Sequence, residues 1–104
     1  MLEQIGFNVT EATDGSQGLQ VCAERRFDLV LVDQFMPVMD GLEFISNFRI
    51  EAQHADIPVI LCSSDGRPQL MRAAVAAGAD SYLNKPYTAS GLHRRLRDLR
   101  LPPA

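Results

Sequence analysis

Short, almost wholly apolar runs alternate along this chain with longer stretches in which apolar residues recur every three or four positions. Residues 28–32 and 57–62 are nearly continuous in apolar side chains, which is typical of strands buried on both faces of a parallel sheet. Pro58 is compatible with the second strand because it lies near the strand's start. Residues 7–12 and 80–83 predict two further, shorter strands.

A stretch of helical periodicity follows each of these runs and begins at a residue suited to a helix start. The expected caps or first residues are Asp14 or Ser16, then Asp40, Pro68 and Thr88. Glu43, three residues after Asp40, completes a capping-box pattern. Gly78 suits the C-terminal end of the third helix.

Strand and helix alternate four times, which predicts an α/β fold. We expect a doubly wound parallel sheet of four strands with about four helices. At 104 residues the chain has room for one domain, residues 1–104. The carboxyl ends of parallel strands meet at one edge of such a sheet, and that edge is where α/β proteins bind ligands.

Charge and composition narrow the class of protein. The formal net charge is −3, so direct binding to nucleic acid is not expected. No apolar run approaches the roughly 20 residues that cross a bilayer, and no secretory leader is apparent, so we expect a cytoplasmic protein without a membrane partner. Cys22 and Cys62 lack metal-ligand spacing and are expected to be buried, reduced thiols. Lys85 is the one lysine among ten basic residues, which hints at a need for a compact ammonium group there.

Three polar residues follow predicted strands: Asp33, Ser63 and Lys85. Taken singly, each has an ordinary structural explanation, as a loop starter, a turn former or a surface lysine. A carboxylate, a hydroxyl and an ammonium group at one edge together suit phosphoryl transfer onto the carboxylate. The carboxylate oxygen would attack phosphorus, while the other two groups would bind the phosphoryl oxygens.

The residues around this set resemble a known family. Residues 31–41 read L-V-D-Q-F-M-P-V-M-D-G, and residues 76–87 read A-A-G-A-D-S-Y-L-N-K-P-Y. With I-P-V-I at residues 57–60 and Ser63 after it, they resemble in order and spacing the receiver domain of bacterial two-component response regulators. Residues 5–15 are also similar to the family, so the resemblance covers essentially the whole chain. It implies a flavodoxin-like, chemotaxis-type fold.

The resemblance implies a role for each matching position. Asp33 would accept the phosphoryl group, and Lys85 would form an ion pair with the phosphoaspartate. Ser63 would be the hydroxyl that turns toward the phosphoryl group, and Tyr82 would be the aromatic switch whose rotamer follows that movement. Pro86 would hold the lysine's loop through a cis peptide bond.

Phe35, two positions after the acceptor, has two roles by the same resemblance. Its backbone carbonyl oxygen would bind Mg²⁺ together with the Asp33 carboxylate. Its ring would restrict the access of water to the phosphoaspartate and so slow hydrolysis.

The metal site is where the printed sequence departs from the family. The family's first strand ends in an acidic pair that binds Mg²⁺, and this sequence begins after that point. The chain could be a fragment of a longer receiver, which we favour, or a natural short form in which residues 7–12 pair with residues 28–32. In a third explanation, a partner chain supplies the strand. For a short form we expect weak Mg²⁺ binding and little phosphorylation by acetyl phosphate, because Asp33 and one carbonyl are a poor cage.

We expect a phosphoacceptor in a His-to-Asp phosphorelay rather than an enzyme. Its partners would be a sensor histidine kinase or phosphotransfer protein and a downstream effector domain or protein, reached through the last two helices and the strand between them; a homodimer is left open. The alternative is a degenerate receiver that binds partners without phosphorylation, which the missing acidic pair favours and the retained Asp33, Ser63 and Lys85 oppose. A hydrolase or flavin carrier is disfavoured, because G-x-S-x-G and G-x-G-x-x-G are absent and His54 and His93 lie far apart.

Overall fold

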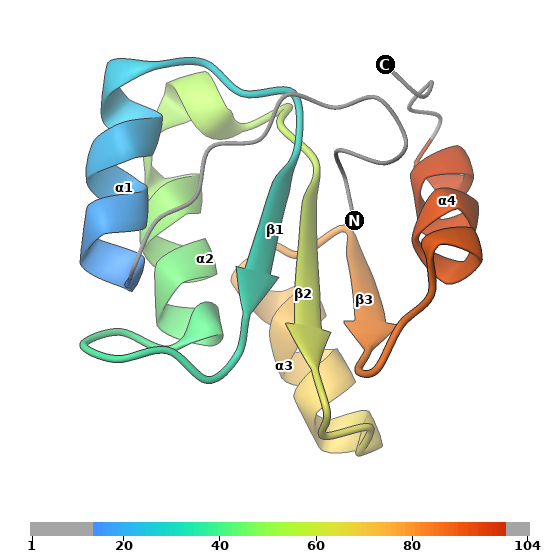
Figure 1. The fold of residues 1–104 in the computed structure, drawn as a ribbon. Helices are drawn as coiled ribbons and strands as arrows, with labels where there is room; N and C mark the ends of the chain where they lie inside the picture. Colours follow the sequence, from blue (N-terminus) through green and yellow to red (C-terminus); the bar gives the residue numbers. More distant parts are fainter. Residues whose placement is uncertain (1–13, 100–104) are drawn as a thin grey trace.

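The computed structural model describes residues 14–99 of the chain, which form a three-stranded parallel sheet. The strands are β1 (Val30–Asp33), β2 (Val59–Ser63) and β3 (Ser81–Asn84), in the order β1-β2-β3 (Figure 1). Three of the four predicted strands are confirmed, each displaced by one or two residues toward the C-terminus. The predicted strand at residues 7–12 lies outside the described residues.

Within residues 14–99, four α-helices and one short 3-10 helix accompany the strands. They are α1 (Gly15–Glu24), α2 (Gly41–Ile50), η2 (Ala52–His54), α3 (Pro68–Ala77) and α4 (Ala89–Asp98). Asp14, Asp40 and Thr88 each accept a hydrogen bond from the backbone N–H three residues later, at 2.9 or 3.0 Å, as the capping pattern predicts. Gly78 ends α3 with φ of +116°, a conformation that glycine adopts readily. The sequence pattern does not predict η2, because three residues are too few to show a period.

The helices cover both faces of the sheet: α1, α2 and α3 lie on one face and α4 on the other (Figure 1). Side chains alternate along β2, so Val59 and Leu61 pack into the first core while Ile60 and Cys62 pack into the second. All five residues of β2 are buried, which explains its continuous apolar sequence. None of the helices between residues 14 and 99 is long and apolar enough to cross a bilayer.

Arg49 forms hydrogen bonds at the amino-terminal edge of the sheet, where β2 and β3 begin. The candidate residues lie at the opposite, carboxyl edge. The Arg49 guanidinium group donates hydrogen bonds to the carbonyl oxygens of Gly78, His54 and Ile57 at 3.0, 2.7 and 2.7 Å. It also pairs with the Asp80 carboxylate at 2.7 Å. One largely buried side chain therefore ties together the ends of α2, η2 and α3 and the starts of β2 and β3.

Candidate functional site

Asp33 and Lys85 meet at the carboxyl edge of the sheet. Asp33 is the last residue of β1, and the Lys85 ammonium group pairs with its Oδ1 atom across the intervening β2. Neighbouring strands lie about 4.8 Å apart, so the Lys85 and Asp33 side chains together bridge two strand spacings. Because it accepts a hydrogen bond from Lys85, the Asp33 carboxylate raises the pKa of that ammonium group. The Asp33 side chain remains 48% exposed, so its carboxylate is accessible from solvent.

The backbone of Lys85 continues the hydrogen bonding between β2 and β3. The Lys85–Pro86 peptide bond is cis, as predicted. The Lys85 N–H donates to the carbonyl oxygen of Ser63 at 2.8 Å, which extends the ladder beyond the pairing of Ser63 with Asn84. The lysine and the serine are thus held at adjoining strand ends.

Ser63 reaches the same edge, but its hydroxyl is engaged by the loop that follows. Ser63 is 1% exposed, and its side-chain oxygen accepts a hydrogen bond from the Asp65 N–H at 3.0 Å. Tyr82 is also buried, and its hydroxyl donates to the carbonyl oxygen of Asp65. The two predicted switch residues therefore contact the same loop residue, Asp65.

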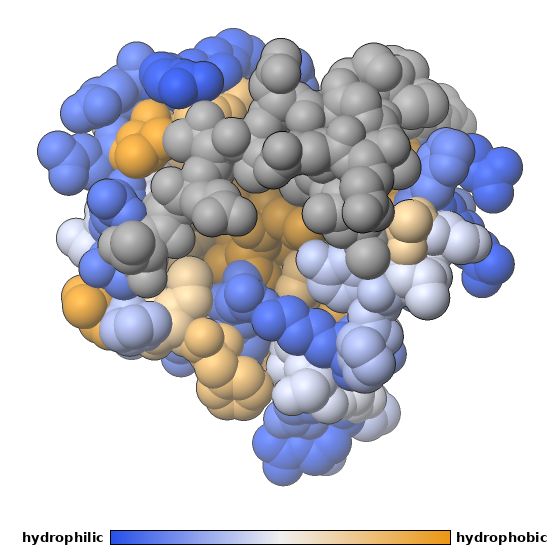
Figure 2. All heavy atoms as spheres, in the orientation of Figure 1, coloured by the Kyte–Doolittle hydropathy of each residue, from blue (hydrophilic) through white to orange (hydrophobic). Residues whose placement is uncertain are grey.

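The loop between β1 and α2 presents apolar side chains beside Asp33. Phe35 is 71% and Val38 79% exposed, and Figure 2 shows apolar side chains over this loop. Val38 has φ of +72°, with the Met39 N–H bonded to the carbonyl oxygen of Pro37 at 2.7 Å. A β-branched residue is strained in such a turn.

Gly41 allows the start of α2 to approach the end of β1. A β-carbon at this position would lie 2.8 Å from the carbonyl oxygen of Asp33 and 2.6 Å from Leu61 Cδ1. The adjoining Gln34 is buried, and its side-chain oxygen accepts a hydrogen bond from the Leu42 N–H at 3.2 Å. Gly41 and Gln34 together hold the start of α2 against the end of β1, next to Asp33.

Gln34, Asp65 and Arg67 do not stand out in the sequence as site residues. A glutamine directly after the acceptor gave no signal, since only the folded chain shows that its side chain is buried. The D-G-R-P sequence after β2 is a turn signature, and it could have identified Asp65 as the residue that orders this loop.

The described residues provide few side-chain ligands for a metal. Between residues 14 and 99 there is no group of three or more His, Cys, Asp or Glu side chains that could hold a metal ion. The resemblance names two ligands in this range, the carboxylate of Asp33 and the carbonyl oxygen of Phe35. They make at most part of a Mg²⁺ shell, which needs six oxygen ligands.

Residues 1–97 match the family described as the response regulator receiver domain, and the chain belongs to this family. It is 33% identical over 97 residues to chemotaxis protein CheY-3 of Vibrio cholerae, covering 92% of this chain and 75% of that protein. It is 32% identical over 108 residues to the transcriptional regulator RpaA of Synechocystis, covering 99% of this chain and 45% of RpaA. The chain thus spans most of the first relative and less than half of the second.

Solved structures share the fold. The chemotaxis protein CheY4 of Vibrio cholerae superposes with a TM-score of 0.88 at 31% identity, over 94% of this chain and 82% of that one. The receiver domain of sensor histidine kinase PA1611 of Pseudomonas aeruginosa gives 0.85 at 28% identity, over 94% and 80%; it has magnesium coordinated in its active site cleft. The α/β, flavodoxin-like receiver fold is therefore the fold of this chain.

Proposed function

We propose that this chain accepts a phosphoryl group on Asp33 in a His-to-Asp phosphorelay. The supporting observation is the ion pair between Asp33 and Lys85, which joins two strand ends that β2 separates. The donor would be the phosphohistidine of a sensor histidine kinase or phosphotransfer protein. The half-exposed carboxylate leaves room for such a macromolecular donor.

The transfer is a displacement at phosphorus. An oxygen of the Asp33 carboxylate forms a bond to phosphorus as the bond between phosphorus and the histidine nitrogen breaks, and the leaving imidazole takes up a proton. Lys85 then binds a phosphoryl oxygen with its ammonium group. The Ser63 hydroxyl donates to another phosphoryl oxygen once it turns away from Asp65. The chain acts as an acceptor and not as an enzyme in its own right.

A Mg²⁺ ion, where bound, would offset the negative charge of the phosphoryl group. Asp33 and the Phe35 carbonyl oxygen are the described residues that would hold it. Because they provide two ligands, we propose that residues 14–99 by themselves bind Mg²⁺ weakly.

Output would pass through the face built by α3, β3 and α4. Phosphorylation shifts a pre-existing equilibrium, so a downstream effector domain or protein must prefer one of two states. We place this relay in the cytoplasm, without a direct nucleic-acid or membrane partner, and a second copy of the chain is one candidate for the output partner.

Phosphorylation of the purified chain tests the proposal. The chain is incubated with acetyl phosphate, or with a phosphorylated histidine phosphotransfer protein, over a rising series of Mg²⁺ concentrations. Borohydride reduction converts an aspartyl phosphate to homoserine, which mass spectrometry then locates; we expect it at position 33.

The Asp33→Asn variant is the control and should lack the label. The alternative of a degenerate binding module is favoured if no Mg²⁺ concentration and no donor labels the parent chain, and if Asp33→Asn leaves signalling intact.

A further inference from the structure

The loop between β2 and α3 is organised around Asp65. Its backbone N–H donates to the Ser63 hydroxyl at 3.0 Å, and its carbonyl oxygen accepts from the Tyr82 hydroxyl. Ser63 in turn accepts a hydrogen bond from the backbone of Lys85, the partner of Asp33. A displacement of Asp65 would therefore move the contacts of both predicted switch residues.

The Asp65 side chain is held by Arg67. Both carboxylate oxygens accept from the guanidinium group, at 2.9 and 3.1 Å from Nε and 2.7 Å from Nη2. The Arg67 backbone N–H also donates to Oδ1 at 3.1 Å. Hydrogen bonds from Arg67 lower the pKa of the Asp65 carboxyl.

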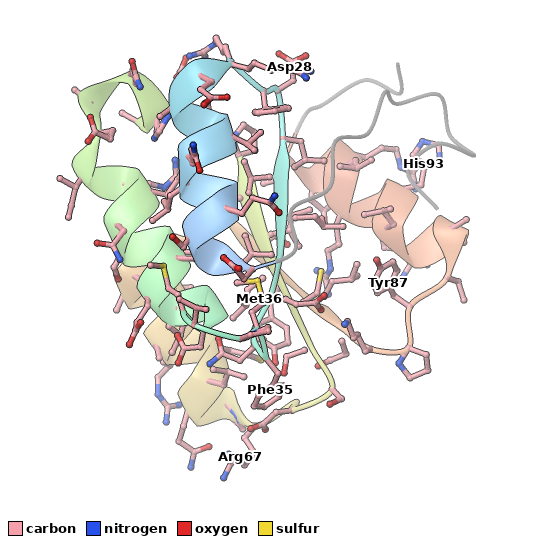
Figure 3. All side chains as sticks on the ribbon, turned by 60° about the vertical axis from the view of Figure 1, so that its left-hand side comes forward. Asp28, Phe35, Met36, Arg67, Tyr87 and His93 are labelled. Carbon is pink, nitrogen blue, oxygen red and sulfur yellow. The ribbon has the colours of Figure 1, made fainter. Side chains whose placement is uncertain are left out.

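Arg67 is accessible at the carboxyl edge of the sheet. Its side chain is 77% exposed, whereas that of Asp65 is 20% exposed. In Figure 3 Arg67 and Phe35 lie at the same end of the molecule, and Asp28 lies at the other. The guanidinium group makes no contribution to either apolar core, so this pair has a local rather than a global structural role.

We propose that Asp65 and Arg67 form a positioning pair that holds the loop in the conformation in which the Tyr82 hydroxyl is bound and Ser63 is engaged. Loosening this pair frees the Asp65 peptide groups, exposes Tyr82 and releases the Ser63 hydroxyl. The part of the inference that concerns Ser63 rests on the proposed phosphorylation of Asp33. The part that concerns Tyr82 does not.

The tyrosine content of the chain allows a direct test. The sequence has two tyrosines and no tryptophan. In a Tyr87→Phe background the tyrosine fluorescence of the chain therefore comes from Tyr82 alone. Acrylamide quenching then measures its exposure in the full chain. Arg67→Gln should raise the population with Tyr82 exposed by about twofold to fivefold, the range expected when an exposed ion pair is lost.

A second arginine provides the matched control. Arg26 Nη2 contacts both carboxylate oxygens of Asp56 at 3.0 Å, with side chains 59% and 75% exposed, on segments that precede β1 and β2. Arg26→Gln removes a similar surface pair away from Tyr82 and should leave quenching unchanged. Equal quenching of the Arg67 and Arg26 variants would overturn the proposal.

Further variants test whether Asp65 and Arg67 act as a pair or independently of each other. Asp65→Asn should match Arg67→Gln, and the double variant should add little to either, because the two residues act through one contact. Arg67→Lys should be intermediate, since an ammonium group does not bind both carboxylate oxygens in the planar arrangement of a guanidinium group. Additive effects in the double variant would refute the pairing.

The rate of Asp33 phosphorylation by acetyl phosphate, measured in the same variants, tests the link to Ser63. Arg67→Gln should change this rate by a factor similar to its change in Tyr82 exposure. If the parent chain is never labelled, the proposed function fails while the quenching result still decides the role of the pair. If the parent is labelled and all variants share its rate, the link between the pair and Ser63 fails.

Discussion

Replacement of Gly41 by alanine should disturb the end of β1 and, with it, Asp33. The new β-carbon would lie 2.6 Å from Leu61 Cδ1, 2.8 Å from the Asp33 carbonyl oxygen and 2.9 Å from Gln34 Cα. Two of these three atoms belong to the backbone, so no side-chain rotation relieves the contact. Overpacking of this kind costs about 1–3 kcal/mol.

The gain in helix propensity offsets part of that cost. Alanine is favoured over glycine within a helix by roughly 0.5–1 kcal/mol, so we expect a net loss of up to about 2.5 kcal/mol in the free energy of unfolding. Urea denaturation, followed by circular dichroism, measures this difference. A second consequence is slower phosphorylation of Asp33, because the carboxylate is displaced relative to Lys85.

Gly91 is the matched control for Gly41. It also lies in the first turn of a helix, but a β-carbon there would meet only Thr88 Oγ1, at 3.4 Å. Gly91→Ala should therefore leave stability unchanged or raise it by up to about 1 kcal/mol. Equal stability of the Gly41 and Gly91 variants would refute the argument that close backbone approach requires glycine at position 41.

Three further predictions follow from single side chains. Phe35→Asn should lose the phosphoryl group from Asp33 faster than the parent, measured by the decay of the acyl phosphate, because the exposed ring no longer restricts water; an unchanged decay rate contradicts this. Burial, with a smaller contribution from Asp33, raises the pKa of the Cys62 thiol from 9.0 to about 12. Cys62 should thus resist alkylation by iodoacetamide at pH 8 until the chain unfolds. Its contribution to the free energy of unfolding should fall as pH rises from about 9 toward 12, because only the unfolded thiol ionises there. Cys62→Ala should lack this fall in stability. Arg49→Met should lower the free energy of unfolding by about 3 kcal/mol, because it removes the ion pair to Asp80 and one hydrogen-bond donor from each of three carbonyl groups; Asp80 Oδ2 and the His54 carbonyl oxygen each keep a backbone donor. Urea denaturation measures the loss, and a loss no larger than that of the exposed-arginine variant Arg26→Gln would contradict this.

The alternation of strands and helices and the place of Asp33 and Lys85 at one edge of the sheet could be predicted because they depend on patterns within the sequence. Continuous apolar runs indicate buried parallel strands, and polar residues directly after such runs must lie at one edge. The predicted strand starts were wrong by one or two residues. The observed β2 begins after Pro58, because proline has no N–H to donate to the neighbouring strand.

The remaining contacts could not be predicted because they join residues through the folded chain. Arg49 has the sequence context of an ordinary helical arginine, and its four partners lie in two other segments, residues 54–57 and 78–80. The burial of Gln34 depends on how closely α2 approaches β1. The bond from the Tyr82 hydroxyl to Asp65 depends on the path of a loop about which the sequence showed only that it turns.

The rigidity of β2 limits how a change at Asp33 can reach the face of α3 and α4. All five residues of β2 are buried, and its side chains pack alternately into both cores, so a shift of the strand would disrupt both cores at once. The loop after it is different: Ser64, Gly66 and Arg67 are exposed, and Asp65 is held mainly by hydrogen bonds and one ion pair. We therefore expect β2 to stay in place while the loop changes.

Hydrogen exchange of the full chain distinguishes these two routes. Amide groups in residues 59–63 should exchange slowly and at the same rate with and without phosphorylation, since they open only with the cores. The Asp65 amide, which the Ser63 hydroxyl protects in this structure, should exchange faster in the phosphorylated chain and in Arg67→Gln. Altered exchange throughout β2, with an unchanged Asp65 amide, would show that the strand itself moves and that the loop does not carry the change.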